Sequence, residues 1–377
     1  MKKVRMIVTV LILGALFSIA YSSNQLDPGE QVKMLSEEEA VLKEVNTITA
    51  TMTLEEKVWQ LFFVAPEALE GGSLSEQPVG GIVYFSEHFE DRQQTIDMIT
   101  AAQAGSEIPL FIGVDEEGGQ VARAGSVPQL GTTLLPPMKE IGDTGNTNEA
   151  YNAGVTLGSD LRELGFNIDF APVADVLIYE KNKEIGDRAF GDDPQLVADM
   201  TASLVQGMES TGVSSVLKHF PGHGSVKTNS HKGTAESART YEELKDCEFI
   251  PFEAGIKAGS DFVMISHMTL TEATEEKVPS SLSAEVVSGF LRSDLEFEGI
   301  IITDAFNMEA ITDEYSSGQA AVKALNAGVD MILMPEDLNA AHGAVMAAVE
   351  NGTIPQERID QSVRRILMVK IQNDIIK

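Results

Sequence analysis

The chain has 377 residues, of which 43% are apolar, and its formal net charge is −31. This length suits one large domain or two ordinary ones, and the apolar content is typical of a globular protein with a buried core. Nucleic-acid binding needs a basic surface, so the acidic balance leads us to expect no nucleic-acid partner. Cys247 is the only cysteine, so this sequence forms no internal disulfide.

The first twenty residues have the pattern of an export signal rather than of a folded element. Three basic residues precede an apolar run at 6–20, in which Ser18 and Ala20 are small residues suited to a cleavage site. An uncleaved anchor is the alternative, because the run is close to the shortest that spans a membrane. We therefore expect residues 1–20 to be a signal peptide or N-terminal anchor. The protein is then exported, with membrane contact at most through this segment.

Residues 21–50 are polar and acidic and predict a linker followed by a first helix. After them, eight short apolar runs recur at intervals. The runs are continuous rather than alternating, which is typical of parallel strands buried on both faces. They are Leu61–Ala65, Gly81–Phe85, Leu110–Val114, Phe166–Phe170, Ser214–Leu217, Phe262–Ser266, Gly299–Thr303 and Met331–Met334.

Amphipathic stretches of helical length separate most of these runs or follow the last one. They are Asp91–Ala104, Asn148–Leu164, Gln195–Ser210, Glu242–Lys257, Ala284–Leu295, Gly318–Asn326, Leu338–Glu350 and Pro355–Ile371. Eight strand–helix alternations predict an α/β fold, a (β/α)8 TIM barrel that forms a single domain over residues 51–377. A doubly wound open sheet is the alternative, but no run is followed by a glycine fingerprint for a dinucleotide or a phosphate.

Polar side chains follow successive runs, where the strands of a barrel end and where barrel enzymes carry their chemistry. They are Asp115, Glu116, Glu117, Arg123, Asp169, Asp175, Asp187, Arg188, Lys218, His219, His267 and Asp304. A pocket that mixes carboxylates, cations and imidazoles suits a ligand with many hydroxyl groups. One aspartate that closes a strand, together with a loop that carries a proton shuttle, follows the logic of retaining glycoside cleavage.

Half of the six histidines lie in one run, Lys218–His231. We expect this run to be an irregular loop that presents Lys218 and three imidazoles at the end of a strand. The spacing of His219 and His223 also occurs in helical metal sites, but Pro221 and Gly222 between them oppose a helix. We therefore expect neither a metal site nor a cofactor.

At this point the sequence resembles the β-N-acetylglucosaminidases of glycoside hydrolase family 3, from about Thr53 to Ile371. Several motifs in the same order carry the resemblance. They are Asp115-Glu116-Glu117-Gly118-Gly119 with Arg123, Gly186-Asp187-Arg188-Ala189-Phe190, the Lys218–His231 run, and Thr303-Asp304-Ala305-Phe306-Asn307-Met308-Glu309-Ala310. The histidine run distinguishes this branch from the β-glucosidases of the family.

The resemblance implies a role for each matching residue. Asp304 is expected to be the nucleophile that forms a covalent glycosyl-enzyme, and His231 the general acid and base. His223 is expected to hold the loop. The residues expected to bind the terminal sugar are Asp115, Arg123, Arg188, Lys218 and His219.

One position departs from the family pattern, which reads Asp-Ser-His where this chain has Asn229-Ser230-His231. A carboxylate beside a catalytic histidine fixes its tautomer and stabilises its protonated form, whereas an asparagine supplies no charge. This departure leaves three readings: a slow enzyme, an enzyme for activated leaving groups, or one that recruits another carboxylate.

The expected function is that of an exported β-N-acetylhexosaminidase, which removes terminal β-linked N-acetylglucosamine from peptidoglycan fragments or chito-oligosaccharides. Its partner is then a small carbohydrate. A phosphorylase is the second reading, because Asn229 repels an anionic acceptor less than aspartate does. The third is a weakly active or silent sugar-binding homologue.

Overall fold

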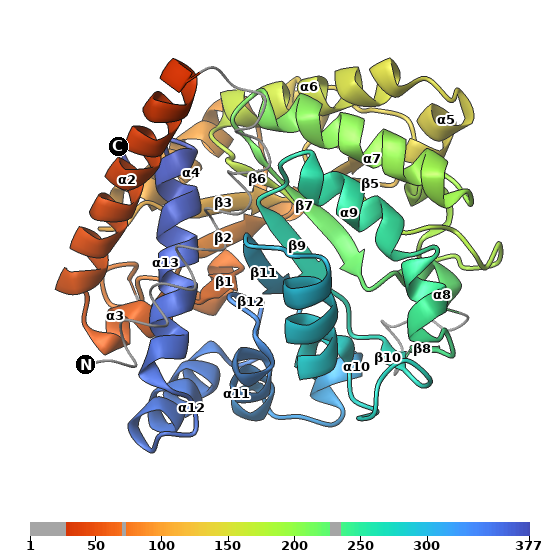
Figure 1. Cartoon of the computed structure of the whole chain (residues 1–377). Coiled ribbons are helices and arrows are strands. Elements are labelled where there is room, and N and C mark those ends of the chain that lie inside the picture. Colours follow the sequence, from red (N-terminus) through yellow and green to blue (C-terminus); the bar gives the residue numbers. More distant parts are fainter. Residues whose placement is uncertain (1–27, 70–72, 227–234) are drawn as a thin grey trace. The chain divides into compact units, whose positions relative to one another are not determined.

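A computed structural model describes residues 28–69, 73–226 and 235–377 of the chain (Figure 1). The expected signal segment at 1–20 lies outside these residues. Residues up to Thr51 form a unit of their own, and its described part is the helix α2 (Pro28–Thr51). Within the described ranges, no helix has the length and apolar character needed to cross a membrane.

The second unit, from Met52 to Lys377, contains eight parallel strands that follow one another around a barrel in chain order. The predicted eight strands and the (β/α)8 architecture are confirmed. The barrel strands are β1 (Phe62–Val64), β2 (Gly81–Tyr84), β3 (Phe111–Val114), β6 (Ile168–Asp169), β7 (Ser214–Phe220), β9 (Phe262–Ile265), β11 (Ile300–Thr303) and β12 (Ile332–Leu333).

Two contacts close the barrel and exclude the open doubly wound sheet. β12 pairs with β1 in parallel, with Phe62 opposite Ile332. On its other side, Ile302 of β11 bridges Met331, and the amide of Thr303 donates to the carbonyl of Met331 at 3.1 Å. Both edges of the sheet are therefore hydrogen-bonded.

Helices surround the strands (Figure 1). They are α3 (Leu54–Trp59), α4 (Arg92–Ala104), α5 (Met138–Asp143), α6 (Thr147–Leu164), α7 (Pro194–Glu209), α8 (Tyr241–Lys245), α9 (Phe249–Lys257), α10 (Glu309–Thr312), α11 (Ser317–Ala327), α12 (Leu338–Glu350), α13 (Gln356–Gln372) and the π-helix η8 (Glu285–Asp294). Short polar residues begin several of them: the side chains of Asp91, Asp193 and Asp337 accept the first free amides of α4, α7 and α12.

Four short strands lie outside the barrel: β4 (Glu116–Gly118) pairs with β5 (Val121–Ala122), and β8 (Glu236–Ser237) with β10 (Thr269–Leu270). Short 3-10 helices include η2 (Ser86–His88), η4 (Gly186–Arg188), η5 (His223–Ser225), η1 (Pro66–Leu69), η3 (Pro128–Leu130) and η7 (Ser280–Leu282).

Glycines inside α6 and α7 explain how closely these two helices approach. A Cβ atom on Gly154 would lie 2.2 Å from the carbonyl oxygen of Leu204, and one on Gly207 would lie 2.1 Å from that of Tyr151. No larger residue fits at either position without moving the partner backbone. The two helices lie side by side in Figure 1 for this reason.

The single helix predicted at Glu242–Lys257 is wrong, because the structure divides it into α8 and α9. Pro251 lies in the first turn of α9, where its missing amide hydrogen is tolerated, but a helix that continued from α8 would bring its ring against the carbonyl four residues earlier. At the break, Glu248 is buried and its carboxylate binds Arg239 at 2.8 and 2.9 Å. The helix predicted at Ala284–Leu295 exists with π-helical bonding.

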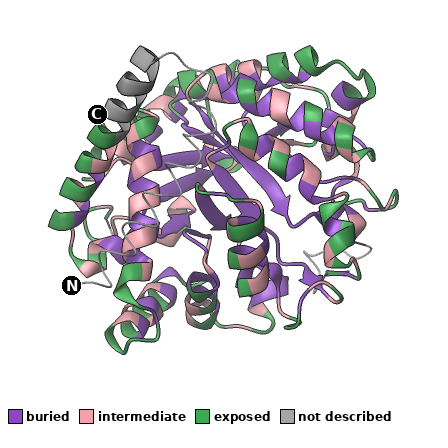
Figure 2. Cartoon of the chain, in the orientation of Figure 1, coloured by how far each residue is buried: buried purple, intermediate pink, exposed green. Residues whose placement is uncertain are grey.

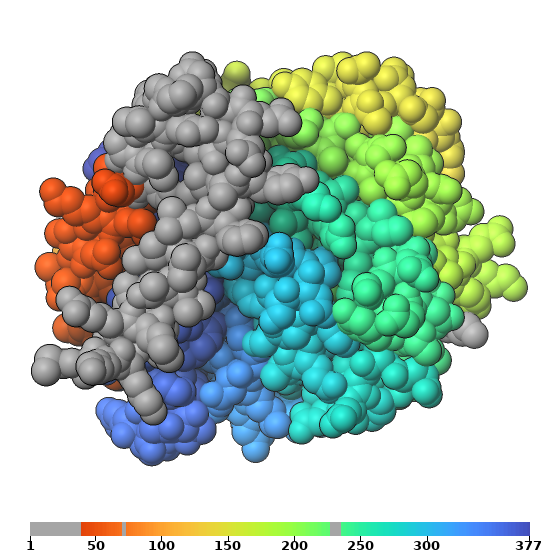
Figure 3. All heavy atoms as spheres, in the orientation of Figure 1, coloured from red at the N-terminus to blue at the C-terminus, as the bar shows by residue number. Residues whose placement is uncertain are grey.

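The strands form the buried centre, and the helices expose mainly their outward faces (Figure 2). Large aromatic side chains pack edge to face across neighbouring segments, as between Phe63 and Phe170, whose ring centroids are 5.3 Å apart. In the space-filling view, segments after residue 240, coloured teal to blue, adjoin on one surface (Figure 3). Helices η8 and α11 are in contact there.

A buried ion cluster lies at the amino end of β12. Asp330 is fully buried, and its carboxylate accepts hydrogen bonds from Ser362 at 2.6 Å, Arg358 at 3.2 Å and Arg365 at 3.3 Å, and from Arg292. Burial raises the pKa of Asp330, but the attraction of the three guanidinium groups outweighs it and holds that pKa well below its usual range. One anion therefore compensates three cations contributed by η8 and α13.

Replacing Asp330 with alanine is expected to destabilise the fold by about 3–5 kcal/mol, because three partly buried cations lose their counter-charge. Urea unfolding of wild type and variant measures this difference. The matched control is Asp143→Asn, which breaks an exposed pair with Lys139 and is expected to cost less than about 1 kcal/mol. Equal costs for the two variants would contradict a structural role for the Asp330 cluster.

Candidate active site

The polar residues expected at the strand ends meet at the carboxyl end of the barrel. Asp115 follows β3, and Glu117 lies on β4, two residues further along the chain. Lys218 lies on β7 and Arg188 on η4. Segments far apart in the sequence thus contribute to one group of side chains, as their positions after parallel strands predict.

Ion pairs connect these side chains into a network. The ammonium group of Lys218 lies 2.6 Å from Asp115 Oδ1 and 2.5 Å from Glu117 Oε1. The guanidinium of Arg188 binds both oxygens of Glu117, at 2.7 and 2.8 Å. Lys218 and Glu117 are each only 2% exposed, so neither charge is stable here without the other.

The charges in this network change the protonation of its members. Burial raises the pKa of Glu117, but the attraction of Lys218 and Arg188 outweighs it and lowers that pKa to about 2. Burial lowers the pKa of Lys218, but the attraction of Asp115 and Glu117 outweighs it and raises that pKa. Both residues are therefore charged at neutral pH.

The expectation that Lys218 and His219 stand on an irregular loop is wrong, because β7 continues through both to Phe220. Backbone hydrogen bonds explain the longer strand: the amide of Ala174 donates to the carbonyl of Lys218 at 2.7 Å, and that of Ser266 to the carbonyl of Phe220 at 2.9 Å. Both functional side chains are thus held on a rigid element.

Asp175 is in contact with His219 and His223 and accepts three hydrogen bonds from them. Its carboxylate accepts from the ring of His219 at Nδ1 (2.7 Å), from the amide of His219 (3.2 Å) and from the amide of His223 (2.5 Å). The rings of His219 and His223 pack edge to face, with centroids 6.0 Å apart. His223 is buried and ties the start of the loop to Asp175.

Arg123 follows β5 and lies close to Asp115, because its amide donates to the carbonyl of Asp115 at 3.1 Å. Its guanidinium lies 5.8 Å from the centroid of the Phe85 ring. Among the described residues its Nε has no hydrogen-bond partner, although this atom is buried. The group is thus placed beside the network without being an ion-pair partner in it.

Asp304 follows β11, and its side chain is partly exposed. Its amide donates to the carbonyl of Ile265 at 2.8 Å, and its Oδ1 accepts from the amide of Ala305 at 2.8 Å. Burial raises the pKa of Asp304, but electrostatic attraction from His267 and His219 outweighs it and holds that pKa below its ordinary value. The carboxylate is therefore ionised and oriented, as a nucleophile must be.

Two further carboxyl groups behave in the opposite way. Glu116 accepts the amides of Ala124 (2.6 Å) and Gly125 (3.0 Å), yet burial raises its pKa to about 7. Asp169 is fully buried, which raises its pKa well above the ordinary value, and its Oδ1 accepts the amide of Glu116 at 2.9 Å. The hydrogen bonds of these two acids hold the turn that follows Asp115. At low pH both carboxyl groups are protonated, so they add no negative charge to the pocket.

Sequence reasoning gave no role to Glu117 and Asp175, although both are central to the geometry. Glu117 lies two residues after Asp115, and in extended chain alternate residues lie on the same face, so its place beside Asp115 was readable from this spacing, whereas its pairing with Lys218 was not. Asp175 had no such signal beyond its place after a strand. Asn229 and His231 lie outside the described residues.

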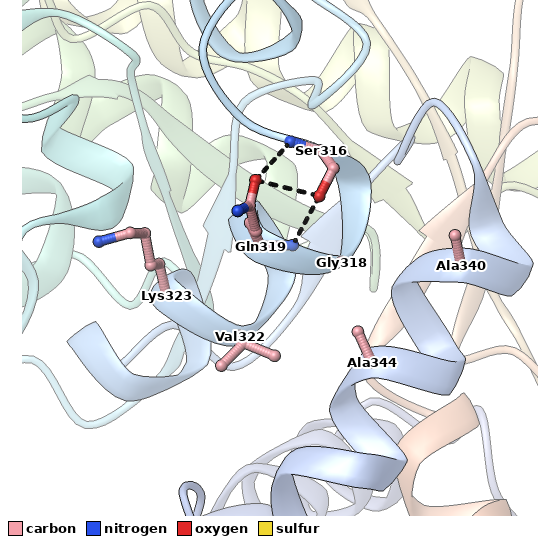
Figure 4. Close-up of a pocket in the computed structure, with 7 residues that line it drawn as sticks. All are labelled: Ser316, Gly318, Gln319, Val322, Lys323, Ala340 and Ala344. Atoms are coloured by element: carbon pink, nitrogen blue, oxygen red, sulfur yellow. Dashed lines mark hydrogen bonds between the residues drawn. The ribbon is translucent and has the colours of Figure 1, made fainter.

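Within the part of the chain that the structure describes, no group of three or more histidine, cysteine or acidic side chains has a metal-binding arrangement. A shallow apolar groove lies elsewhere, between α11 and α12 in the outer helix layer (Figure 4). Gly318, Val322, Ala340 and Ala344 line it, and Ser316 closes the capping box of α11 with Gln319. It offers none of the carboxylates found at the barrel end.

Barrels of this type carry their active sites at the carboxyl ends of the strands. Ionised carboxylates, paired cations and imidazoles meet at that end here. Fold and site together define an enzyme of the (β/α)8 class with a polar substrate.

The comparisons with known proteins agree with this class. Residues 53–369 match the model of the glycosyl hydrolase family 3 N-terminal domain. The chain is 36% identical over 289 residues to a protein named beta-hexosaminidase from Stenotrophomonas maltophilia, covering 74% of this chain and 83% of that protein. A protein of the same name from Xylella fastidiosa is 35% identical over 286 residues, with the same shares covered.

Two solved structures extend the likeness to three dimensions. A family 3 β-N-acetylglucosaminidase from Paenibacillus superposes with a TM-score of 0.82 at 36% identity, covering 86% of this chain and 63% of that one. A family 3 glycosyl hydrolase from Mycobacterium smegmatis gives 0.77 at 30% identity, covering 85% and 98%. The chain thus spans less than two thirds of the Paenibacillus protein. The chain belongs to glycosyl hydrolase family 3, so the expected family and the glycoside hydrolase class are confirmed.

The opposite pKa shifts of Glu117 and Glu116 predict opposite pH dependences of stability. The pKa of Glu117 falls from 4.5 to about 2 on folding, so its contribution, roughly 3 kcal/mol, is present above about pH 4.5 and is lost as pH falls towards 2. The pKa of Glu116 rises from 4.5 to about 7, so wild type loses stability as pH rises between these values.

Chemical unfolding from pH 3 to about 8 compares wild type with Glu117→Gln and Glu116→Gln. The deficit of Glu117→Gln is expected to shrink as the solution is acidified. Glu116→Gln is the matched neighbouring control, and it is expected to improve relative to wild type as pH rises. The same pH trend in both variants would show that the two carboxyl groups do not differ as described.

Proposed function

We propose that the protein is an exported, retaining exo-β-N-acetylglucosaminidase that removes terminal, non-reducing N-acetylglucosamine from peptidoglycan fragments or chito-oligosaccharides. The observation that carries the proposal is the ionised carboxylate of Asp304 beside a preformed group of paired side chains. The names of the relatives from Stenotrophomonas, Xylella and Paenibacillus support the choice of sugar. Export follows from the signal pattern in residues 1–20.

The paired side chains suit a terminal sugar because each offers polar atoms in a fixed direction. Asp115 supplies acceptors, while Lys218, Arg188 and Arg123 supply donors, and His219 has one ring nitrogen that faces Arg188. Sugar hydroxyl groups both donate and accept, so such a mixture satisfies them. Because buried ion pairs already hold the side chains of the network in place, few of them have to be ordered when the sugar binds.

The proposed reaction proceeds in two steps. In the first, an oxygen of Asp304 attacks the anomeric carbon while the glycosidic oxygen takes a proton from His231 and leaves. In the second, water attacks the same carbon while His231 takes its proton, the bond from that carbon to the Asp304 oxygen breaks, and the sugar departs with retained configuration. The amide of Ala305 holds the carboxylate of Asp304 in one orientation through both steps.

Replacing Asp304 with asparagine is expected to lower turnover of a chromogenic β-N-acetylglucosaminide by more than about 10³-fold, because the nucleophile is lost. A fluorosugar that traps the covalent intermediate is expected to label Asp304 in the wild type. Asp313→Asn, an exposed aspartate after α10, is the matched control and should retain activity.

The same assay separates the competing functions. Product analysis with and without inorganic phosphate distinguishes free sugar from sugar phosphate, and a predominance of sugar phosphate would make the protein a phosphorylase. A wild type that binds the sugar without turning it over would make it a silent binding protein. Labelling at a carboxylate other than Asp304 would contradict the proposed nucleophile.

A separate prediction concerns Asn229 and its neighbour. If Asn229 only orients His231, then Asn229→Asp should raise the rate on natural linkages and move the pH profile upward, because a nearby carboxylate favours the protonated imidazole. His231→Ala should slow natural substrates far more than aryl glycosides, whose leaving groups need little protonation.

The measurement is the pH profile of kcat/KM on a chito-oligosaccharide and on an aryl glycoside. Asn351→Asp adds the same charge at an exposed position after α12 and serves as the control. An Asn229→Asp variant that is neutral or slower on both substrates would mean that another group serves His231.

A further inference from the structure

Asp175 has no part in the reaction as proposed, yet its carboxylate accepts three hydrogen bonds beside the site. It is fully buried, so it cannot touch a substrate directly. All three groups that it accepts, at 2.5 to 3.2 Å, belong to His219 and His223. Whatever Asp175 contributes to the reaction therefore passes through these histidines.

The contact with His219 determines where that ring carries its proton. An ionised carboxylate only accepts hydrogen bonds, so the 2.7 Å contact requires a proton on Nδ1 of His219. In the neutral imidazole the other nitrogen, Nε2, then has a free lone pair. That nitrogen lies 3.4 Å from NH2 of Arg188, which only donates, so the two contacts agree on one tautomer.

Electrostatics keep Asp175 in the form that this contact needs. Burial raises the pKa of the carboxyl group, but the hydrogen bonds that it accepts from the His219 ring and the His223 amide favour its charged form and hold the pKa below its ordinary value. The carboxylate is thus present over the whole neutral range. A carboxylate that fixes an imidazole tautomer is the arrangement that Asn229 cannot supply to His231.

The ring of His219 is held from its other side as well. Arg188 is anchored by two hydrogen bonds to Glu117 and one to the carbonyl of Glu184, so its position next to Nε2 is fixed. A continuous chain of polar contacts runs from Asp175 through His219, Arg188 and Glu117. His219 is 8% exposed, and it is close enough to Asp304 to lower the pKa of that carboxyl group.

We infer that Asp175 is a positioning residue for sugar binding: it keeps Nε2 of His219 unprotonated beside Arg188, as an acceptor for a hydroxyl group of the substrate. This inference rests on the proposed function, because it assigns the partner of Nε2 to the terminal sugar. Arg188 donates to the same hydroxyl oxygen or its neighbour. His219 thus accepts a hydrogen bond from the sugar hydroxyl group, and Arg188 donates one to a hydroxyl oxygen.

A purely structural role is the competing explanation, since Asp175 also accepts the amide of His223. A double-mutant cycle separates the two, because an effect that passes through the His219 ring disappears when that ring is absent. The variants are Asp175→Asn, His219→Ala and their combination, assayed with p-nitrophenyl β-N-acetylglucosaminide. Asp261→Asn is the matched control, since it changes a partly buried carboxylate bound by Ser214 and Asn373 at the other barrel end.

In the wild-type background, Asp175→Asn is expected to lower kcat/KM about 10- to 100-fold, mainly through a higher KM, because the amide permits the wrong tautomer. In the His219→Ala background the same change is expected to cost less than about 2-fold. The control is expected to lose less than about 2-fold as well. Equal losses in both backgrounds would overturn the inference in favour of a structural role.

A second measurement needs neither activity nor the variant. Proton–nitrogen NMR spectra of the histidine rings report which nitrogen of His219 is protonated, and the expected wild-type result at neutral pH is Nδ1–H with bare Nε2. Protonation at Nε2 instead would overturn the inference, even if Asp175→Asn fails to fold. If wild type lacks glycosidase activity while His219 has the expected tautomer, the proposed function fails and the positioning of His219 by Asp175 stands.

Discussion

The pocket depends on one buried anion, the carboxylate of Glu117, placed between two cations. Lys218 and Arg188 come from β7 and η4, and each would be expensive to bury without a counter-charge. By accepting from both, Glu117 sets the distance between them and thereby the shape of the site. Asp115 and His219 each contact one of these two cations. The groups proposed to bind the sugar are thus arranged by a residue to which no contact with the sugar is assigned.

The two ends of the barrel use buried charge for different purposes. At the amino end, Asp330 is enclosed by three guanidinium groups and joins η8 and α13 to the last strand. At the carboxyl end, anions and cations are nearly balanced, and the network reaches solvent through Asp115. A closed cluster suits the joining of elements, whereas an open one leaves polar atoms for a ligand. Placing catalysis and stability at opposite ends is characteristic of this fold.

Much of the architecture was readable from the sequence because buried parallel strands appear as continuous apolar runs. All eight runs became strands, and the polar residues after them identified the end that carries the site. A single helix over Glu242–Lys257 was mispredicted because the amphipathic pattern continues across the break, whereas Pro251 restricts the backbone before it. The partners of His219 and Lys218 were harder to read, since ion pairs between strands depend on barrel register and side-chain direction. No spacing along the chain shows that Asp175 accepts a hydrogen bond from the ring of His219.

The pairing of β12 with β1 has a consequence for how this enzyme folds. The first strand remains an open edge until the last one arrives, some 270 residues later along the chain. Contacts between such distant segments are slow to form, because a long loop must close first. Asp304 directly follows β11, which lies between β9 and that final strand. A nascent or truncated chain that ends before β12 has every other barrel strand but no closed barrel around Asp304. The carboxylate of Asp304 is therefore held in a closed barrel only once the chain extends through β12.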